Sequence, residues 1–206
     1  MDYEFTKARL IILLSRQPER YLEAGVLGGG IIEQYQKALA AIHSEKPKLA
    51  IKILKKLEKK SRHPWIRLAL AEAYTAKNDD KNALQVLTAL SNLYPGYLPA
   101  TMALAKAFNN NDMPDKSILL LKNQLQTDDY GIIHEALAKA YYANGQISAA
   151  LESTGNQYTR QGYIELAIQQ YDNALKQKDI SPSTRQRLES QKSELQKAIQ
   201  RYKDQL

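Results

Sequence analysis

The stretch LAEAYTAKNDDKNALQVLTAL, residues 70–90, decides the fold of this chain. Its apolar residues recur at helical spacing on both sides of the polar segment KNDDKN, which is the pattern of two helices joined by a turn. Related stretches begin at Lys37, Leu104 and Leu137, so that successive copies are 33, 34 and 33 residues apart. A repeat of this length predicts a row of stacked helical hairpins, since one hairpin alone cannot bury its apolar face.

The four copies share small side chains at two fixed places in each hairpin. This pattern resembles the tetratricopeptide repeat, a helix–turn–helix unit with small residues at positions 8 and 20, an aromatic residue at 11 and proline at 32. The small residues here are Ala38, Ala71, Ala105 and Ala138 at position 8, and Ala50, Ala83, Ser117 and Ala150 at position 20. Three copies carry the aromatic residue, as Tyr74, Phe108 and Tyr141. Pro95 takes position 32, and the departures are Ala41 at position 11 and Leu57, Leu90 and Gln124 at position 27.

The second helix of the fourth copy, from Ser148 to Arg160, also fits the first-helix pattern of a further unit. In that register Gly155 takes position 8, Tyr158 position 11, and Ala167 position 20. Gly145 and Gly162 fit helix ends, where glycine adopts the left-handed conformation. Ser181 and Pro182 then begin a polar closing helix, with one stripe formed by Leu188, Leu195, Ile199, Tyr202 and Leu206.

The N-terminal region is less regular. Residues 2–15 fit an amphipathic helix that stops near Pro18. The following GVLGGG segment, residues 25–30, lacks the Lys-Ser/Thr pair and the preceding strand of a phosphate-binding loop, which favours a connector. We therefore predict an all-α fold, a right-handed tetratricopeptide superhelix (α-solenoid) of about four to five helix pairs with a C-terminal capping helix. The expected divisions are residues 1–30, 31–180 and 181–206.

Composition is ordinary for a globular chain, with 44% hydrophobic and 25% charged residues. There is no cysteine and no apolar run of about 18 residues, so neither disulfides nor a membrane span is expected. We expect either a cytosolic protein or a fragment without its targeting segment. The net charge of +7 is concentrated in residues 46–62, which contain eight basic residues and one acidic residue.

One short segment resembles part of a metal-binding motif. His134-Glu135 begins HEALA, which resembles half of the HExxH zinc motif, but Ala138 stands where the second histidine would bind the metal. The other two histidines, His43 and His63, are far away in sequence. We therefore predict that HEALA begins a repeat helix, and we expect no metal site, no catalytic residue and no cofactor in this chain.

In tetratricopeptide repeats the first helix of each hairpin lines a concave groove. Mapped onto this sequence, the predicted partner-binding groove presents Trp65, Glu72, Met102, Lys106, Asn109, Asn110, Glu135, Lys139, Tyr142, Asn156 and Arg160. Its mixture of charged, amide and aromatic groups suits an extended polypeptide.

A second candidate surface is basic. Lys48, Lys52, Lys55, Lys56, Lys59 and Lys60 lie around one face of the helix predicted in residues 46–62. This face is a solvated outer surface, or it docks to an acidic protein or to anionic lipid head groups. Nucleic acid is a weaker alternative, because no exposed aromatic residue accompanies the lysines.

Further stretches narrow the resemblance. FTKARLIIL (5–13), QYQKALAAI (34–42) and the segment from HEALAKAYYANGQ to RLESQKSEL (134–195) follow one another as in the C-terminal region of the periplasmic β-barrel-assembly-enhancing proteases. In that family the repeats follow an HExxH zinc-peptidase domain, which would lie upstream of this chain and would hold the zinc.

The resemblance implies a non-catalytic interaction domain in a Gram-negative periplasm. Its expected partners are the barrel-assembly machinery, outer-membrane protein precursors and its own peptidase domain. Peripheral contact with an anionic membrane surface is an additional possibility, and no nucleic acid is expected. The alternative is a free-standing tetratricopeptide adaptor in pilus or secretion assembly.

Overall fold

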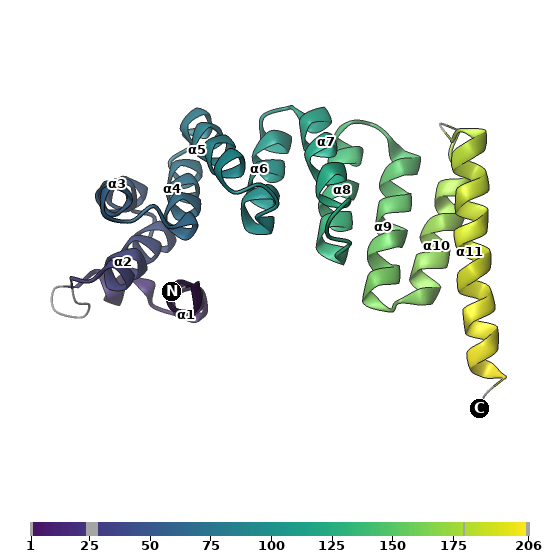
Figure 1. The fold of residues 1–206 in the computed structure, drawn as a ribbon, viewed down its shortest axis with the longest axis horizontal. Coiled ribbons are helices and arrows are strands. Elements are labelled where there is room, and N and C mark those ends of the chain that lie inside the picture. Colours follow the sequence, from purple (N-terminus) through teal and green to yellow (C-terminus); the bar gives the residue numbers. More distant parts are fainter. Residues whose placement is uncertain (1, 24–28, 179, 205–206) are drawn as a thin grey trace. The chain divides into compact units, whose positions relative to one another are not determined.

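The computed structural model describes residues 2–23, 29–178 and 180–204. In these ranges the chain forms helices and no strand (Figure 1). They are α1 (Asp2–Leu14), the 3₁₀ helix η1 (Pro18–Leu22), α2 (Ile31–His43), α3 (Pro47–Lys60), α4 (Pro64–Ala76), α5 (Asp80–Leu93), α6 (Leu98–Asn110), α7 (Pro114–Gln124), α8 (Gly131–Ala143), α9 (Ile147–Gln161), α10 (Ile164–Leu175) and α11 (Pro182–Lys203). The all-α prediction is confirmed, including an N-terminal helix. Residues 25–28 of the expected connector (25–30) and the stripe residue Leu206 lie outside the described ranges.

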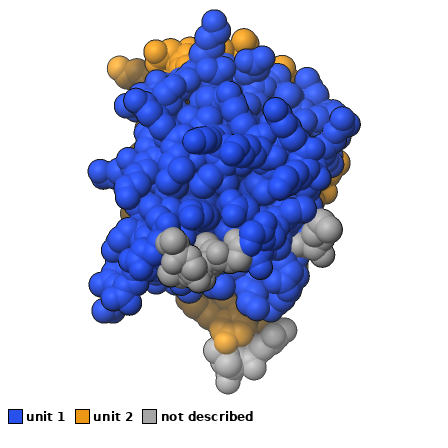
Figure 2. Space-filling view, turned by 90° about the vertical axis from the view of Figure 1, so that its left-hand side faces the viewer, with its two compact units in different colours: residues 1–107 blue, residues 108–206 orange. Residues whose placement is uncertain are grey.

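The chain divides into two compact units, residues 1–107 and 108–206 (Figure 2). The first contains α1 to α5 and most of α6. The second contains the end of α6 and α7 to α11. None of the helices in the described ranges combines the length and apolar character needed to span a bilayer.

Burial confirms the predicted repeat register. The alanines at position 8 and the alanines and serine at position 20 are all buried, with exposed fractions of 5% or less. Small side chains let the two helices of a hairpin approach closely, so larger residues at these places would separate them. Proline begins α3, α4, α7 and α11, where its missing N–H is one that a helix leaves unpaired anyway.

The turns repeat with the same spacing as the helices. Glu45, Asn78, Asp112 and Gly145 stand 33, 34 and 33 residues apart, and all four have left-handed backbones, with φ of 57°, 60°, 54° and 72°. Each residue closes the turn between the two helices of its hairpin. The repeat is therefore present in the backbone as well as in the side chains.

In the second unit α9 packs against both α8 and α10, which confirms that neighbouring helix pairs share it. Gly162 ends α9 with φ 80°, as predicted. Ser181 caps α11, its Oγ accepting from the Thr184 N–H at 3.1 Å. The closing helix packs mainly through its first half, since Leu188 is fully buried whereas Tyr202 is 65% exposed. The expected apolar stripe is therefore only partly covered.

Candidate functional site

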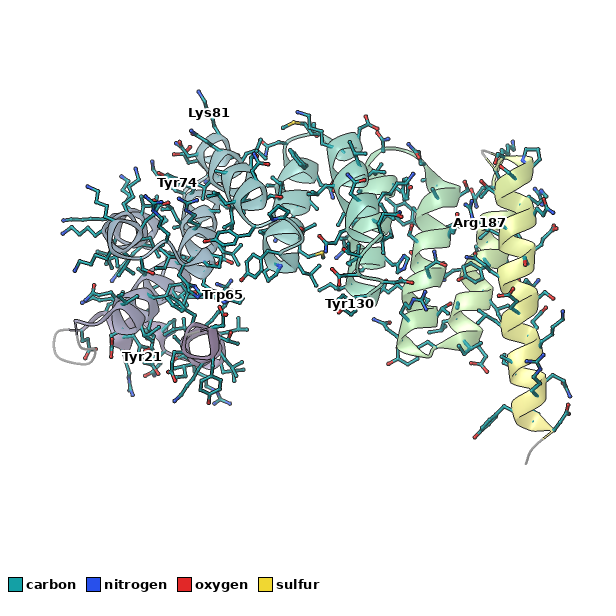
Figure 3. The ribbon with its side chains drawn as sticks, in the orientation of Figure 1. Tyr21, Trp65, Tyr74, Lys81, Tyr130 and Arg187 are labelled. Atoms are coloured by element: carbon teal, nitrogen blue, oxygen red, sulfur yellow. The ribbon has the colours of Figure 1, made fainter. Side chains whose placement is uncertain are left out.

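In the first unit the chain occupies part of the predicted groove itself. Arg9 of α1 forms an ion pair with Glu72 of α4 and donates a hydrogen bond to the Tyr35 hydroxyl at 3.4 Å. Its guanidinium also lies over the Trp65 ring, 5.5 Å from the ring centre. Figure 3 shows Trp65 on α4. Two of the predicted groove residues, Trp65 and Glu72, therefore hold α1.

This contact is partly buried and electrostatically satisfied. Burial opposes the charge of Arg9, but the ion pair and hydrogen bond with Glu72 outweigh it and raise the pKa of Arg9. Burial also raises the pKa of Tyr35 to about 12, so its hydroxyl stays neutral. The aromatic ring of Phe5 stacks on His63, with ring centres 4.1 Å apart. α1 is thus fixed to α2 and α4 at several points.

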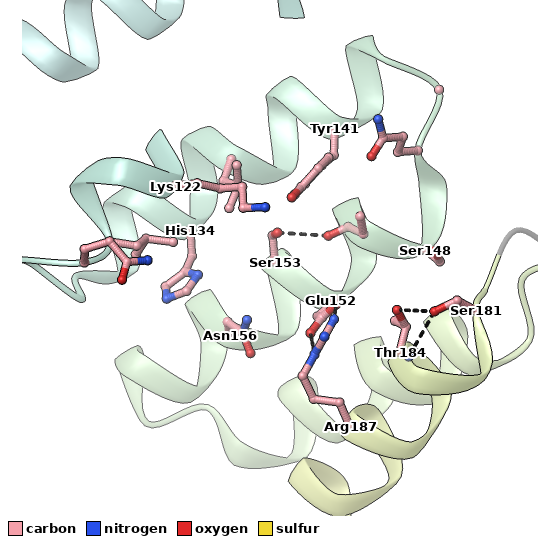
Figure 4. Close-up of a pocket in the computed structure, with 16 residues that line it drawn as sticks. Lys122, His134, Tyr141, Ser148, Glu152, Ser153, Asn156, Ser181, Thr184 and Arg187 are labelled. Carbon is pink, nitrogen blue, oxygen red and sulfur yellow. Dashed lines mark hydrogen bonds and ion pairs between the residues drawn. The ribbon is translucent and has the colours of Figure 1, made fainter. Parts of the chain in front are cut away.

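The second unit contains an open cavity of about 630 Å³, which we call the outer cavity (Figure 4). Residues from the end of α7, from α8, from α9 and from the start of α11 form its wall. They include Lys122, Gln126, His134, Leu137, Tyr141, Ser148, Glu152, Ser153, Asn156, Ser181, Thr184 and Arg187. The wall mixes polar and apolar side chains, contains both charge signs and includes the rings of His134 and Tyr141.

Arg187 and Glu152 join α11 to α9 at this wall. The Nε and one terminal nitrogen of Arg187 donate to the two carboxylate oxygens of Glu152, both at 2.8 Å. These hydrogen bonds raise the pKa of Arg187. A paired bidentate contact fixes geometry more than it attracts a ligand. Lys122 differs, because it is exposed and pairs with no carboxylate among the described residues.

A second cavity of about 350 Å³, which we call the inner cavity, shares His134 and Asn156 with the outer one. It is lined by Asp129, His134, Asn156, Thr159, Arg160, Tyr171, Gln191, Glu194 and Leu195. Since the two cavities meet at the same two side chains, we treat them as one candidate site between α8, α9 and α11.

His134 is oriented by Asp129 at the point where the cavities meet. Its Nε2 lies 2.6 Å from Asp129 Oδ1, while Arg160 pairs with the other carboxylate oxygen. Burial opposes the charge of Asp129, but the hydrogen bonds from Arg160 and His134 outweigh it and lower the pKa of Asp129. The carboxylate therefore accepts the Nε2 hydrogen, so that a tautomer with its single hydrogen on Nε2 has its lone pair on Nδ1. That Nδ1 is buried and has no partner among the described residues.

Tyr171 supports the inner cavity from α10. Its hydroxyl donates to Asn156 Oδ1 at 2.8 Å and lies 3.2 Å from the Thr159 hydroxyl. The ring is almost completely buried. Burial raises the pKa of Tyr171, so the hydroxyl remains a neutral donor. The carboxamide of Asn156 is therefore fixed in one orientation at the shared wall.

Other predicted groove residues lie near this site without lining it. Lys139 and Tyr142 are exposed on α8 and Glu135 is partly exposed, and Lys139 pairs with Glu135 at 2.6 Å. Of the predicted residues in the second unit, Asn156 and Arg160 line the cavities. Asn109 is partly buried and Asn110 is exposed at the end of α6. Met102 and Lys106 belong to the first unit.

Several residues that line the cavities were not predicted as site residues from the sequence. His134 entered only as a metal candidate, and Tyr141 only as a packing aromatic. Asp129 lies five residues before His134, just ahead of α8, and no sequence pattern connected the two side chains. No local signal connects Glu152 with Arg187, because 35 residues separate them.

Among the described residues, His134 is not part of a cluster of metal-ligating side chains. No three His, Cys, Asp or Glu side chains in the described ranges gather around a common point. His134 lies in the first turn of α8, where the sequence placed it.

The six lysines of the predicted basic face are all exposed on α3 in the first unit. Lys52, Lys56 and Lys60 line a third cavity, of about 360 Å³, together with Lys37 of α2. Lys55 lies over the ring of Tyr74, 5.6 Å from its centre.

Comparison with known proteins agrees with this architecture. Residues 33–107 match the family model of the tetratricopeptide repeat. No curated protein sequence gives a significant match. Among solved structures, TTC0263, a thermophilic tetratricopeptide protein of Thermus thermophilus, is 22% identical with a TM-score of 0.56. The match covers 92% of this chain and 97% of that one.

Two MamA structures are also similar. The structure from Desulfovibrio magneticus RS-1 is 14% identical with a TM-score of 0.58, over 84% of this chain and 98% of that one. The MSR-1 structure is 16% identical with a TM-score of 0.56, over 78% and 96%. At these identities the likeness concerns the fold. The fold of this chain is that of a tetratricopeptide-repeat protein.

Proposed function

We propose that this chain is a protein-interaction module that binds a polypeptide segment at the joined cavities between α8, α9 and α11. The observation that carries this proposal is the set of uncommitted groups around one opening. Lys122 offers an exposed cation, and His134, whose Nδ1 has no hydrogen-bond partner among the described residues, lines both cavities. The ring of Tyr141 contributes amphipathic contact area beside them. Together these groups match the carboxylates, main-chain amides and apolar side chains of a peptide.

The first unit is less suited to this role. Arg9 already engages Trp65 and Glu72, so a ligand there would have to displace α1. The second unit has no such occupant in its cavities among the described residues. This difference supports placing the partner in the second unit.

For the partner we propose the barrel-assembly machinery or an outer-membrane protein precursor, with the chain acting in the periplasm as the accessory domain of a zinc metallopeptidase. The support is the resemblance of residues 5–13, 34–42 and 134–195 to that family. The alternative is an independent adaptor. Its support is the likeness in fold to TTC0263, a thermophilic tetratricopeptide protein.

Binding of a denatured outer-membrane protein precursor and of purified barrel-assembly machinery tests the proposal. Surface-immobilised chain should capture at least one of the two. Lys122→Ala with Arg160→Ala should weaken that capture by about 1 kcal/mol or more for each side chain that anchors the ligand. Lys197→Ala, an exposed change on α11, is the matched control and should bind normally. Undiminished capture by the double variant would move the site elsewhere.

The two versions of the proposal predict different genomic sequences upstream of residue 2. An in-frame HExxH domain behind a signal peptide supports the accessory-domain version. A start codon at Met1 supports the independent adaptor and contradicts the accessory domain.

A further inference from the structure

A second surface on the first unit combines lysines with a recessed apolar floor. The cavity between α2 and α3 is lined by Lys37 of α2 and by Lys52, Lys56 and Lys60 of α3, together with Gln34 and Gly29. Leu49, Ile53 and Leu57 form the apolar part of its wall. No acidic residue lines it among the described residues. We call this surface the lysine groove.

The lysines of this groove are uncommitted. None of the four forms an ion pair or hydrogen bond with a carboxylate of the described chain. The acidic residue within α3, Glu58, pairs instead with Arg67 at 2.9 Å. Four like charges around one cavity repel one another, and an opposite charge from outside relieves that repulsion.

The spacing of these residues follows one helix. Lys52, Lys56 and Lys60 are four residues apart, and Leu49, Ile53 and Leu57 form the adjacent row with the same period. From residue 49 to residue 60 the two rows extend along α3 for about 16 Å, at about 1.5 Å per residue. A partner helix with an apolar stripe flanked by carboxylates presents the complementary rows.

The hairpin of α2 and α3 already packs against one helix of its own chain. α4 packs against both α2 and α3, so a helix laid across two helices is how this hairpin makes its known contact. We propose that the lysine groove docks an acidic amphipathic helix of a partner protein. Its carboxylates would pair with Lys37, Lys52, Lys56 and Lys60, and its apolar side chains would enter between them.

A membrane surface fits the groove less well. Helices that lie in a bilayer interface present their apolar side chains outermost. Here Leu57 is 3% exposed and Leu49 37% exposed, while Lys52, Lys56 and Lys60 stand above them as exposed residues. Single-stranded nucleic acid fits poorly as well, because no aromatic side chain lines the groove for base stacking.

The test uses the full chain and a synthetic peptide with leucines at helical spacing and glutamates on both flanks. Fluorescence anisotropy should show saturable binding that weakens with salt, as expected for exposed charges. Lys52→Gln with Lys56→Gln should weaken binding about tenfold or more at low ionic strength. Lys48→Gln with Lys59→Gln removes the same charge from α3 outside the groove and should change binding by less than about threefold.

Two further experiments distinguish binding in the lysine groove from nonspecific attraction between opposite charges. Leu49→Gln keeps every lysine and should also weaken peptide binding, provided that its circular dichroism and melting match the parent. A scrambled peptide of the same composition should bind at least about tenfold more weakly. Equal binding of the scrambled peptide, or equal losses from the two lysine pairs, would overturn the proposal. So would vesicles containing phosphatidylserine that bind the chain while the helical peptide does not.

Discussion

Gly155 of α9 lies directly against the ring of Tyr171 of α10. A Cβ placed on Gly155 would overlap Tyr171 Cε1 and would lie 2.6 Å from Cδ1, closer than carbon atoms approach in proteins. Tyr171 has no free space to move into, because it is 2% exposed and its hydroxyl bonds to Asn156 and Thr159. The absence of a side chain at position 155 therefore sets the approach of α9 to α10, and with it the wall of the inner cavity.

Gly155→Ala should consequently destabilise the chain, although alanine is the better helix former by about 1 kcal/mol. We expect a loss of about 1–3 kcal/mol in the free energy of unfolding, and a larger loss for Gly155→Leu. Urea denaturation followed by circular dichroism measures it. In a double-mutant cycle, Tyr171→Leu should remove most of the penalty for Gly155→Ala, since the clashing ring is gone. A stabilised Gly155→Ala chain would contradict the close contact.

Ala83→Leu tests the same principle in the first unit. Ala83 is 1% exposed and occupies position 20 of its hairpin. Overpacking there should cost about 1–3 kcal/mol, measured by thermal unfolding. Ala89→Leu, an exposed change on the same helix, serves as the control and should melt with the parent. If the Ala83→Leu variant has the same melting temperature as the parent, the repeat register is wrong.

The repeated left-handed turns predict a stabilising change. Glu45 holds φ 57°, where a residue with a side chain is disfavoured by about 1–2 kcal/mol relative to the right-handed conformation. Glu45→Gly should raise the free energy of unfolding by about 0.5–1 kcal/mol, after the greater flexibility of glycine in the unfolded chain is included. Gly145→Ala, at the equivalent turn with φ 72°, should lower it. Changes of the same sign in both variants would contradict the equivalence of the two turns.

The first unit should lose stability on mild acidification. Burial lowers the pKa of His63 below its ordinary 6.5, although Asp2 beside Nε2 opposes the shift. When a base has a lower pKa in the folded chain than in the unfolded chain, it stabilises the fold at pH values above its unfolded-state pKa. That contribution decreases as the pH falls from 6.5 through the folded-state value. Protonation also removes the Nδ1 acceptor that caps α4 by binding the Trp65 N–H.

Trp65 is the single tryptophan of the chain, so its fluorescence reports thermal unfolding of this region. We expect its melting temperature to fall between about pH 7 and about pH 5.5, the range in which an unfolded histidine gains its proton. His63→Asn keeps a capping side chain without a group that titrates there. The fall in melting temperature over this range should shrink in that variant. If the fall in melting temperature is the same in His63→Asn as in the parent, groups other than His63 cause it.

Most of the architecture was predictable because the repeat is a local pattern. The small residues at positions 8 and 20 and the glycines that end helices act within one hairpin or between neighbouring helices. The capping helix was also predictable at its start, through Ser181 and Pro182. Its poorly covered end was not, because the apolar spacing of Tyr202 does not show that nothing packs beside it.

The candidate site was less predictable. The groove positions mapped from the repeat select Glu135, Lys139 and Tyr142, whereas the cavities are lined by the neighbouring row, His134, Leu137 and Tyr141. A small rotation of α8 decides which row faces α9, and sequence spacing does not specify that rotation. The engagement of Trp65 by Arg9 depends on how α1 folds back, which involves residues 56 positions apart.

Site-specific photo-crosslinking tests most directly the claim that the joined cavities of the second unit bind a polypeptide. A photoreactive amino acid is placed at Gln126, which is exposed at the outer cavity, and separately at Gln169, which is exposed on α10 away from it. Each chain is irradiated with a denatured outer-membrane protein precursor or with the barrel-assembly machinery. The account predicts an adduct with one of these partners from position 126 and none from position 169. Adducts from position 169 with none from position 126 would contradict it.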